Sequence, residues 1–68
     1  MDTMMTGAEI KTIRERLGLT GPAFAALINE RVPGARVTKQ AVWGWENGLR
    51  TPSPAMATII RALAAVAG

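Results

Sequence analysis

Lys39 and Gln40, which directly follow Thr38, are the side chains in this chain with the clearest chemical potential. A glutamine amide carries a donor and an acceptor side by side, which matches N6 and N7 of adenine, and a lysine donates to O6 or N7 of guanine. Thr38 is a good helix N-cap because its hydroxyl can accept a hydrogen bond from a first-turn amide. The three residues therefore predict a helix start suited to reading base edges in a DNA major groove. On an isolated helix, a solvated first turn is the simpler interpretation.

The helix that must position this pair is expected over residues 38–47. Val42, Trp45 and Leu49 recur at helical spacing, so they predict one apolar stripe that faces a core. Asn47-Gly48 provides a left-handed stop, and the two prolines at 52 and 54 prevent an early restart of the helix.

Trp43 lies off that stripe, on the same side as Lys39 and Gln40. Three interpretations of its indole stay open: contact with sugar edges or thymine methyls of DNA, packing against the preceding loop, or a dimer contact. Large aromatic side chains usually find cover, so loop packing and DNA contact have equal weight.

Three further helices are expected, over residues 7–17, 21–29 and 54–66. Thr6 and Glu9 have the spacing of a capping box, and the segment from Asn29 to Val37 is expected to be a loop centred on Pro33-Gly34. The predicted inward faces are formed by Ile10, Ile13, Leu17, Phe24, Leu27, Ile28, Met56, Ile59, Ile60 and Leu63. Residues 1–5 are expected to form a disordered tail. The predicted fold class is all-α, with one domain over residues 6–68 that forms a compact bundle of four short helices.

Length and composition narrow the possible functions. A chain of 68 residues makes one small domain, and it contains no Cys, His or Tyr. No disulfide, thiolate metal site or recognisable nucleophile–base pair can therefore be assembled, so we expect neither an enzyme nor a metal or other cofactor. Eight Lys and Arg against five Asp and Glu give a formal charge of +3, which suits an anionic partner. No apolar run is long enough to cross a membrane, and no small-molecule ligand is indicated.

The residues from 45 to 52, WENGLRTP, resemble the end of the recognition helix in lambda-repressor and Cro-type (XRE-like) helix-turn-helix DNA-binding domains. The resemblance extends backward through residues 10–20 and forward through 54–56, and it covers about residues 6–63. It implies a helix-turn-helix in which residues 38–47 form the recognition helix. The chain departs from the family in its 29–37 loop, which is longer than the usual turn of three or four residues.

The resemblance also implies roles for particular residues. Lys39, Gln40 and Trp43 would contact bases. Contacts with DNA phosphates are expected from Gly21, Arg31, Arg36, Thr38, Asn47, Arg50 and Thr51. Glu46 would be partly buried and would form a structural ion pair with Arg14 of the first helix, with Arg16 as the alternative partner. Gly21 stands where the family often has a phosphate-binding glutamine, and Gly44 stands where it commonly has a base-reading side chain.

The leading hypothesis is a sequence-specific, double-stranded DNA-binding transcriptional regulator, specifically a repressor that binds a palindromic operator as a homodimer. The resemblance implies a phage or mobile-element setting and a cytoplasmic, nucleoid-associated location. The last helix is the predicted self-association surface, where Val66 would be exposed together with Ile60, the alternative to the inward placement of Ile60 above. The alternative is a protein-interaction module, such as the antitoxin of a toxin–antitoxin pair, in which DNA binding is secondary. Gly21, Gly44 and an exposed Trp43 favour that alternative.

Overall fold

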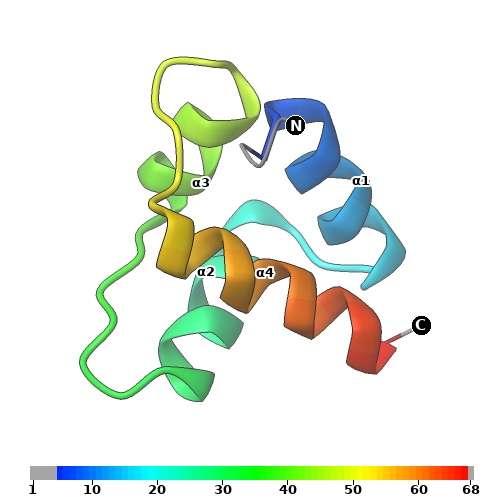
Figure 1. Cartoon of the computed structure of the whole chain (residues 1–68), viewed down its shortest axis with the longest axis vertical. Helices are drawn as coiled ribbons and strands as arrows, with labels where there is room; N and C mark the ends of the chain where they lie inside the picture. The colour runs from blue at the N-terminus through cyan, green and yellow to red at the C-terminus, as the bar shows by residue number, and fades with distance from the viewer. Residues whose placement is uncertain (1–4, 68) are drawn as a thin grey trace.

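Four helices make up most of the chain in a computed structural model that describes residues 5–67 (Figure 1). They are α1 (Gly7–Arg16), α2 (Gly21–Arg31), α3 (Lys39–Glu46) and α4 (Pro54–Ala67), and the described residues include no strand. The predicted all-α bundle of four short helices is therefore confirmed, with most helix ends within one residue of their predicted positions. Within the same residues, no helix combines the length and the apolar content needed to cross a membrane.

Hydroxyl side chains begin all four helices. Thr6, Thr20 and Thr38 each accept a hydrogen bond from the backbone amide three residues later, at 3.1, 3.3 and 3.1 Å. Ser53 does the same for Met56 at 3.2 Å. At α1 the predicted capping box is complete, because the Glu9 carboxylate accepts a hydrogen bond from the Thr6 amide at 3.4 Å. Each cap satisfies an amide that has no partner within its helix, so the helix starts are determined locally.

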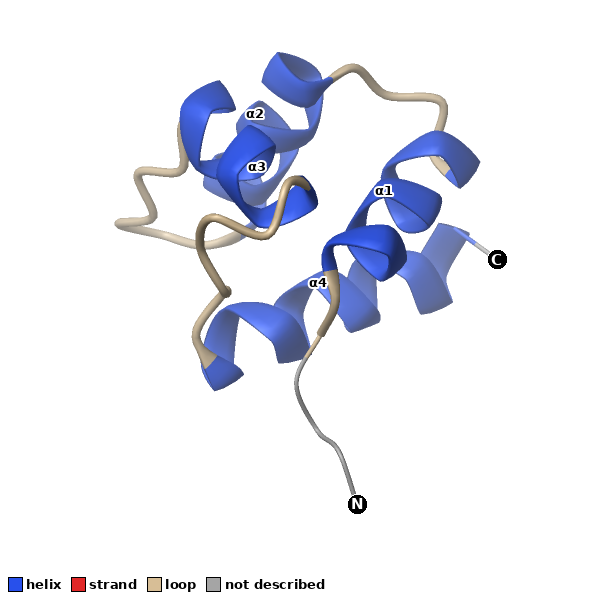
Figure 2. Ribbon diagram, turned by 90° about the horizontal axis from the view of Figure 1, so that it is seen from above, coloured by secondary structure: helices blue, strands red, loops and turns tan. Residues whose placement is uncertain are grey.

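The core lies where α1 and α2 meet α3, and α4 closes it by packing against α1 (Figure 2). Its buried apolar side chains are Met5, Ile10, Phe24, Ala25, Ile28, Val42, Trp45, Ala57 and Ile60. Val42 and Trp45 come from α3, so one side of this short helix is held against both neighbouring helices. The opposite side of α3 is left free to carry polar side chains.

Three predictions about burial are wrong. Leu49 was assigned to the apolar stripe of the third helix, yet it is 68% exposed. Gly48, at φ +76°, turns the chain before Leu49, so helical spacing no longer applies there. Ile60 was placed both on the inward face of the last helix and on its exposed self-association surface. It is fully buried in the core, so the inward placement is confirmed and the exposed one is wrong. Met5, assigned to the disordered tail, is 3% exposed and belongs to the core, whereas the rest of that predicted tail lies outside the described residues.

The connection between α2 and α3 is shorter than predicted, because α2 continues to Arg31 and leaves residues 32–38 outside helices. Asn29 is therefore a helix residue, and its side-chain amide pairs with the backbone of Val37. Its Nδ2 donates to the Val37 carbonyl at 2.8 Å, and its Oδ1 accepts from the Val37 amide at 2.7 Å. Figures 1 and 2 show the connection projecting from the bundle. The two bonds fix its far end, immediately before the cap of α3.

Candidate nucleic-acid interface

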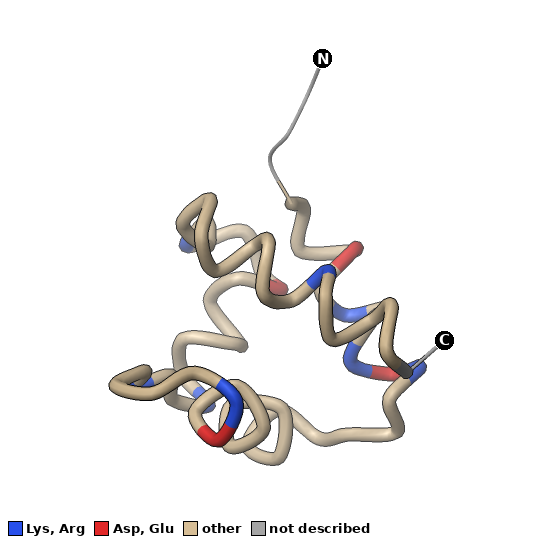
Figure 3. Tube along the Cα trace, turned by 60° about the horizontal axis from the view of Figure 1, so that its bottom comes forward, with Lys and Arg blue, Asp and Glu red and all other residues tan. Residues whose placement is uncertain are grey.

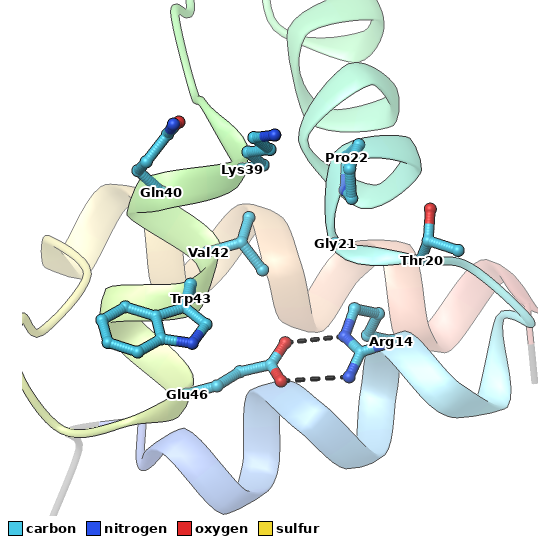
Figure 4. A pocket seen from close by; sticks show the side chains of 9 residues that line it. All are labelled: Arg14, Thr20, Gly21, Pro22, Lys39, Gln40, Val42, Trp43 and Glu46. Carbon is cyan, nitrogen blue, oxygen red and sulfur yellow. Dashed lines mark hydrogen bonds and ion pairs between the residues drawn. The ribbon is translucent and has the colours of Figure 1, made fainter.

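An open groove of about 480 Å³ runs between α3 and the start of α2 (Figure 4). It is lined by Arg14, Thr20, Gly21, Pro22, Lys39, Gln40, Val42, Trp43 and Glu46. In the close-up, Lys39 and Gln40 lie at one end of the groove and the Arg14–Glu46 pair lies at the other. The groove thus joins two segments that are far apart in the sequence, the first turn of α2 and the outer side of α3.

Arg14 and Glu46 form the predicted ion pair at one end of this groove. Nε and Nη2 of Arg14 donate to the two carboxylate oxygens of Glu46 at 2.7 and 3.0 Å, and the side chains are only 18% and 12% exposed. The third nitrogen, Nη1, donates to the carbonyl of Leu19 at 3.0 Å. A single guanidinium therefore ties α1 to α3 and to the residue just before the cap of α2. Arg16, the alternative partner, is exposed.

The same pair controls the ionisation of Arg14. The hydrogen bond to Glu46 raises the pKa of the guanidinium, burial partly opposes this increase, and the nearby charges of Glu46 and Glu15 add to it. A raised pKa leaves Arg14 charged throughout the physiological range.

The outer side of α3 carries the three residues predicted to contact bases. Lys39 and Gln40 are exposed in its first turn, and Trp43 is 60% exposed one turn later. At this exposure the preceding connection does not bury the indole, which lies beside the groove with Lys39 and Gln40 (Figure 4). Side chains on this side of α3 are available to a partner without any rearrangement of the core.

The residues predicted to contact phosphates are more widely spread. Gly21 lines the groove itself, whereas the others surround it or lie beyond it: Arg31, Arg36, Thr38, Asn47, Arg50 and Thr51. Arg31 belongs to the last turn of α2 and not to a loop, which corrects its predicted setting. Asn47 donates through Nδ2 to the Trp43 carbonyl at 2.8 Å and thereby closes α3. Figure 3 shows Lys and Arg positions on several sides of the trace, so charge alone does not define one binding face.

The side chain of Arg50 lies against Gly44, a contact that the sequence did not predict. Gly44 is buried, and a Cβ atom placed on it would lie 3.4 Å from both Cγ and Cδ of Arg50. The amides of Leu49 and Arg50 both donate to the Gly44 carbonyl, at 2.9 and 3.2 Å. Gly44, which stands where the family commonly has a base-reading side chain, is thus covered by the stem of Arg50.

Gly7 is a second glycine whose role was missed. A Cβ atom on Gly7 would lie 2.6 Å from the carbonyl oxygens of both Trp45 and Glu46, a distance that requires backbone to move. The absence of a side chain therefore allows the first turn of α1 to approach the end of α3. The sequence gives only a slight indication of this close approach. Gly7 directly follows the N-cap Thr6, a position at which the helix does not require a glycine.

No protein-family model, curated protein or solved structure matches this chain. Its resemblance to helix-turn-helix domains consequently depends on the motif residues themselves. Among the described residues, no three acidic side chains gather closely enough to hold a metal ion. The chemistry available at the groove is that of exposed hydrogen-bond donors and acceptors, one open aromatic ring and positive charge.

Proposed function

We propose that this protein is a sequence-specific, double-stranded DNA-binding regulator that inserts α3 into the major groove. The observation that carries the proposal is the division of α3 into two sides. Val42 and Trp45 are buried in the core, whereas Lys39, Gln40 and Trp43 are exposed together beside the start of α2. A helix that is anchored on one side and presents base-reading side chains on the other has the arrangement of a recognition helix.

The dimensions of α3 suit this role. An α-helix with its side chains is about 10–12 Å across, and a B-DNA major groove is about 12 Å wide. Lys39 and Gln40 occupy the first turn, which is the part of a recognition helix that reaches base edges in helix-turn-helix proteins. Lys39 would donate to guanine and Gln40 would make a paired contact with adenine.

Contacts with the DNA backbone would come from the segments around α3. The first amides of α2 have no partner within the helix and carry its positive dipole end, so the Gly21 amide suits a phosphate oxygen. Arg36 and Thr51 are exposed and would add further contacts that fix position without reading sequence, a role that the family resemblance also assigns to the exposed Arg50. The ion pair of Arg14 with Glu46 would hold α2 and α3 in the relative placement that both kinds of contact require.

A single module of this size buries too little surface for tight and selective binding, so the proposal includes a homodimer on a palindromic site. Repression of transcription and a nucleoid-associated location complete the proposal. With Ile60 buried in the core, the exposed end of α4 around Val66, which is 81% exposed, is the surface proposed for self-association.

The salt dependence of binding is the direct test of this proposal. We expect a duplex selected from random oligonucleotides to bind with a log–log slope of about −4 to −6 against salt concentration, because about five or six neutralised phosphates would release counterions. The measurement is a fluorescence-anisotropy titration from low to physiological salt. Absence of any DNA binding at the lowest salt would remove the proposal.

Replacement of Gln40 by alanine tests base reading. We expect Gln40→Ala to weaken binding to the selected site by roughly 5- to 150-fold, equivalent to about 1–3 kcal/mol, and to relax the preference at one base pair. Competition titrations with single-base variants of the site give the preference directly. An unchanged ranking of those variants would show that Gln40 does not read a base.

A protein-interaction module, such as an antitoxin, is the second candidate function. The observation that favours it is the exposure of two large apolar side chains, Trp43 at 60% and Leu49 at 68%. Exposed apolar surface of this kind is common at protein interfaces. In that case DNA binding would be weak or absent, and the salt titration above distinguishes the two functions.

A further inference from the structure

Arg50 follows the end of α3, but its side chain lies back along that helix. The stem of Arg50 lies over Gly44, where Cγ and Cδ are 3.4 Å from the position of a glycine Cβ and the Arg50 Cβ is 3.7 Å from it. The backbone is held at the same place, because the Arg50 amide donates to the Gly44 carbonyl at 3.2 Å. Since Nε is bonded to Cδ, the guanidinium begins at the surface of α3 at the level of Gly44.

Gly44 lies four residues after Gln40 on the same helix. Side chains at this spacing are neighbours on one side of a helix, about 5–6 Å apart. Gly44 has no side chain of its own at this position next to Gln40. The long cationic side chain of Arg50 lies there instead. One helical turn advances about 5.4 Å, and a base step about 3.4 Å, so this place is roughly one to two base pairs from the base that Gln40 would contact.

The guanidinium of Arg50 is also available. Arg50 is exposed, and none of the described residues forms an ion pair or side-chain hydrogen bond with it. A guanidinium presents parallel N–H donors that match the O6 and N7 acceptors of guanine, and this pairing is the commonest specific contact in the major groove.

We propose that Arg50 is a specificity-determining residue that selects a guanine next to the base read by Gln40, with Gly44 providing the surface on which its stem lies. The inference rests on the proposed DNA-binding function and deepens it. It also changes the role expected for Arg50, which the family resemblance placed at a phosphate. A phosphate contact would strengthen binding to every sequence, whereas a contact with guanine favours one base pair.

Selection from a random duplex library separates these two roles. The wild-type protein and Arg50→Ala are each taken through the selection, with Arg16→Ala as a control that removes an exposed arginine from the far end of α1. We expect the wild-type and Arg16→Ala motifs to contain a guanine that the Arg50→Ala motif lacks. An identical motif with uniformly weaker binding in Arg50→Ala would overturn the inference. If the wild-type protein enriches no sequence, the proposed function itself fails.

Base analogues then test the atoms involved. Replacement of the selected guanine by 7-deazaguanine removes the N7 acceptor, and we expect wild-type binding to fall roughly 5-fold or more while Arg50→Ala is unaffected. Replacement by hypoxanthine leaves N7 and O6 in place, and we expect wild-type affinity to be retained. Equal losses for the two proteins with 7-deazaguanine would contradict a contact from Arg50.

Two substitutions complete the test. Arg50→Lys keeps the positive charge but loses the paired donors, so we expect the preference for guanine to fall while the salt slope is unchanged. Gly44→Val places methyl groups against the stem of Arg50, and we expect the same loss of preference in a protein whose helical circular dichroism is normal. If Gly44→Val retains the wild-type preference, the guanidinium is not placed by Gly44 and that part of the inference is wrong.

Discussion

Replacement of Glu46 by alanine is expected to lower the free energy of unfolding by about 3 kcal/mol. The substitution removes both acceptors of Arg14 and leaves its guanidinium, whose side chain is 18% exposed, without a countercharge. A mostly buried charge that loses its partner keeps the cost of desolvation without the attraction that offset it. A domain of this size has a net stability of roughly 3–5 kcal/mol, so the variant would retain about 0–2 kcal/mol and about 3–50% of its molecules would be unfolded at 25 °C.

Urea unfolding, followed by circular dichroism at the helical minimum, measures this effect. Glu30→Ala is the matched control, because Glu30 is an exposed acid on α2 that forms no ion pair among the described residues. We expect the control to change stability by less than about 0.5 kcal/mol. If Glu46→Ala unfolds like the control, the pair does not hold α3 in place.

Replacement of Gly7 by alanine is expected to lower the free energy of unfolding by about 2–3 kcal/mol. The new methyl group would stand 2.6 Å from the carbonyl oxygens of Trp45 and Glu46. Because these atoms belong to the backbone at the end of α3, they cannot rotate away as a side chain could. Either α1 or α3 must move, and the contacts of Trp45 in the core move with it.

Gly44→Ala is the matched control for that substitution, and it should have the opposite sign. A Cβ atom at Gly44 meets only side-chain atoms of Arg50, at an ordinary contact distance of 3.4 Å. Alanine is favoured over glycine inside a helix by about 1 kcal/mol, so we expect a small gain in stability. Thermal and urea unfolding of both variants provides the comparison. Equal effects of the two substitutions would show that helix propensity, and not contact with backbone, governs Gly7.

Both destabilising substitutions act on the same junction, the end of α3 against α1. Glu46 secures this end through an ion pair, and Gly7 permits the close approach. Neither residue is proposed to contact DNA, and the residues proposed to contact bases, Lys39, Gln40 and Trp43, are exposed. We therefore expect losses of DNA binding in these two variants to follow the unfolded fraction, unlike the loss in Gln40→Ala.

The sequence by itself was enough to predict the helices and their starts. Thr6, Thr20 and Thr38 each act within three residues of their own position, and a local hydrogen bond depends on local sequence alone. The repeat of Val42 and Trp45 was likewise sufficient to predict the buried side of α3. The partnership of Arg14 with Glu46, across 32 residues, came from the family resemblance and not from any local pattern.

Only the tertiary structure decided how the helices meet. Met5 is buried because other segments cover it, and Leu49 is exposed because the chain turns at Gly48. Three further contacts join residues whose separation changes when the chain folds. They are the two hydrogen bonds between Asn29 and Val37, the contact of Gly7 with the end of α3, and the packing of the Arg50 stem over Gly44. Periodicity describes which side of a helix is apolar, but it contains no distance between one helix and the next. Those distances are set by close packing of the whole bundle, which no single segment encodes.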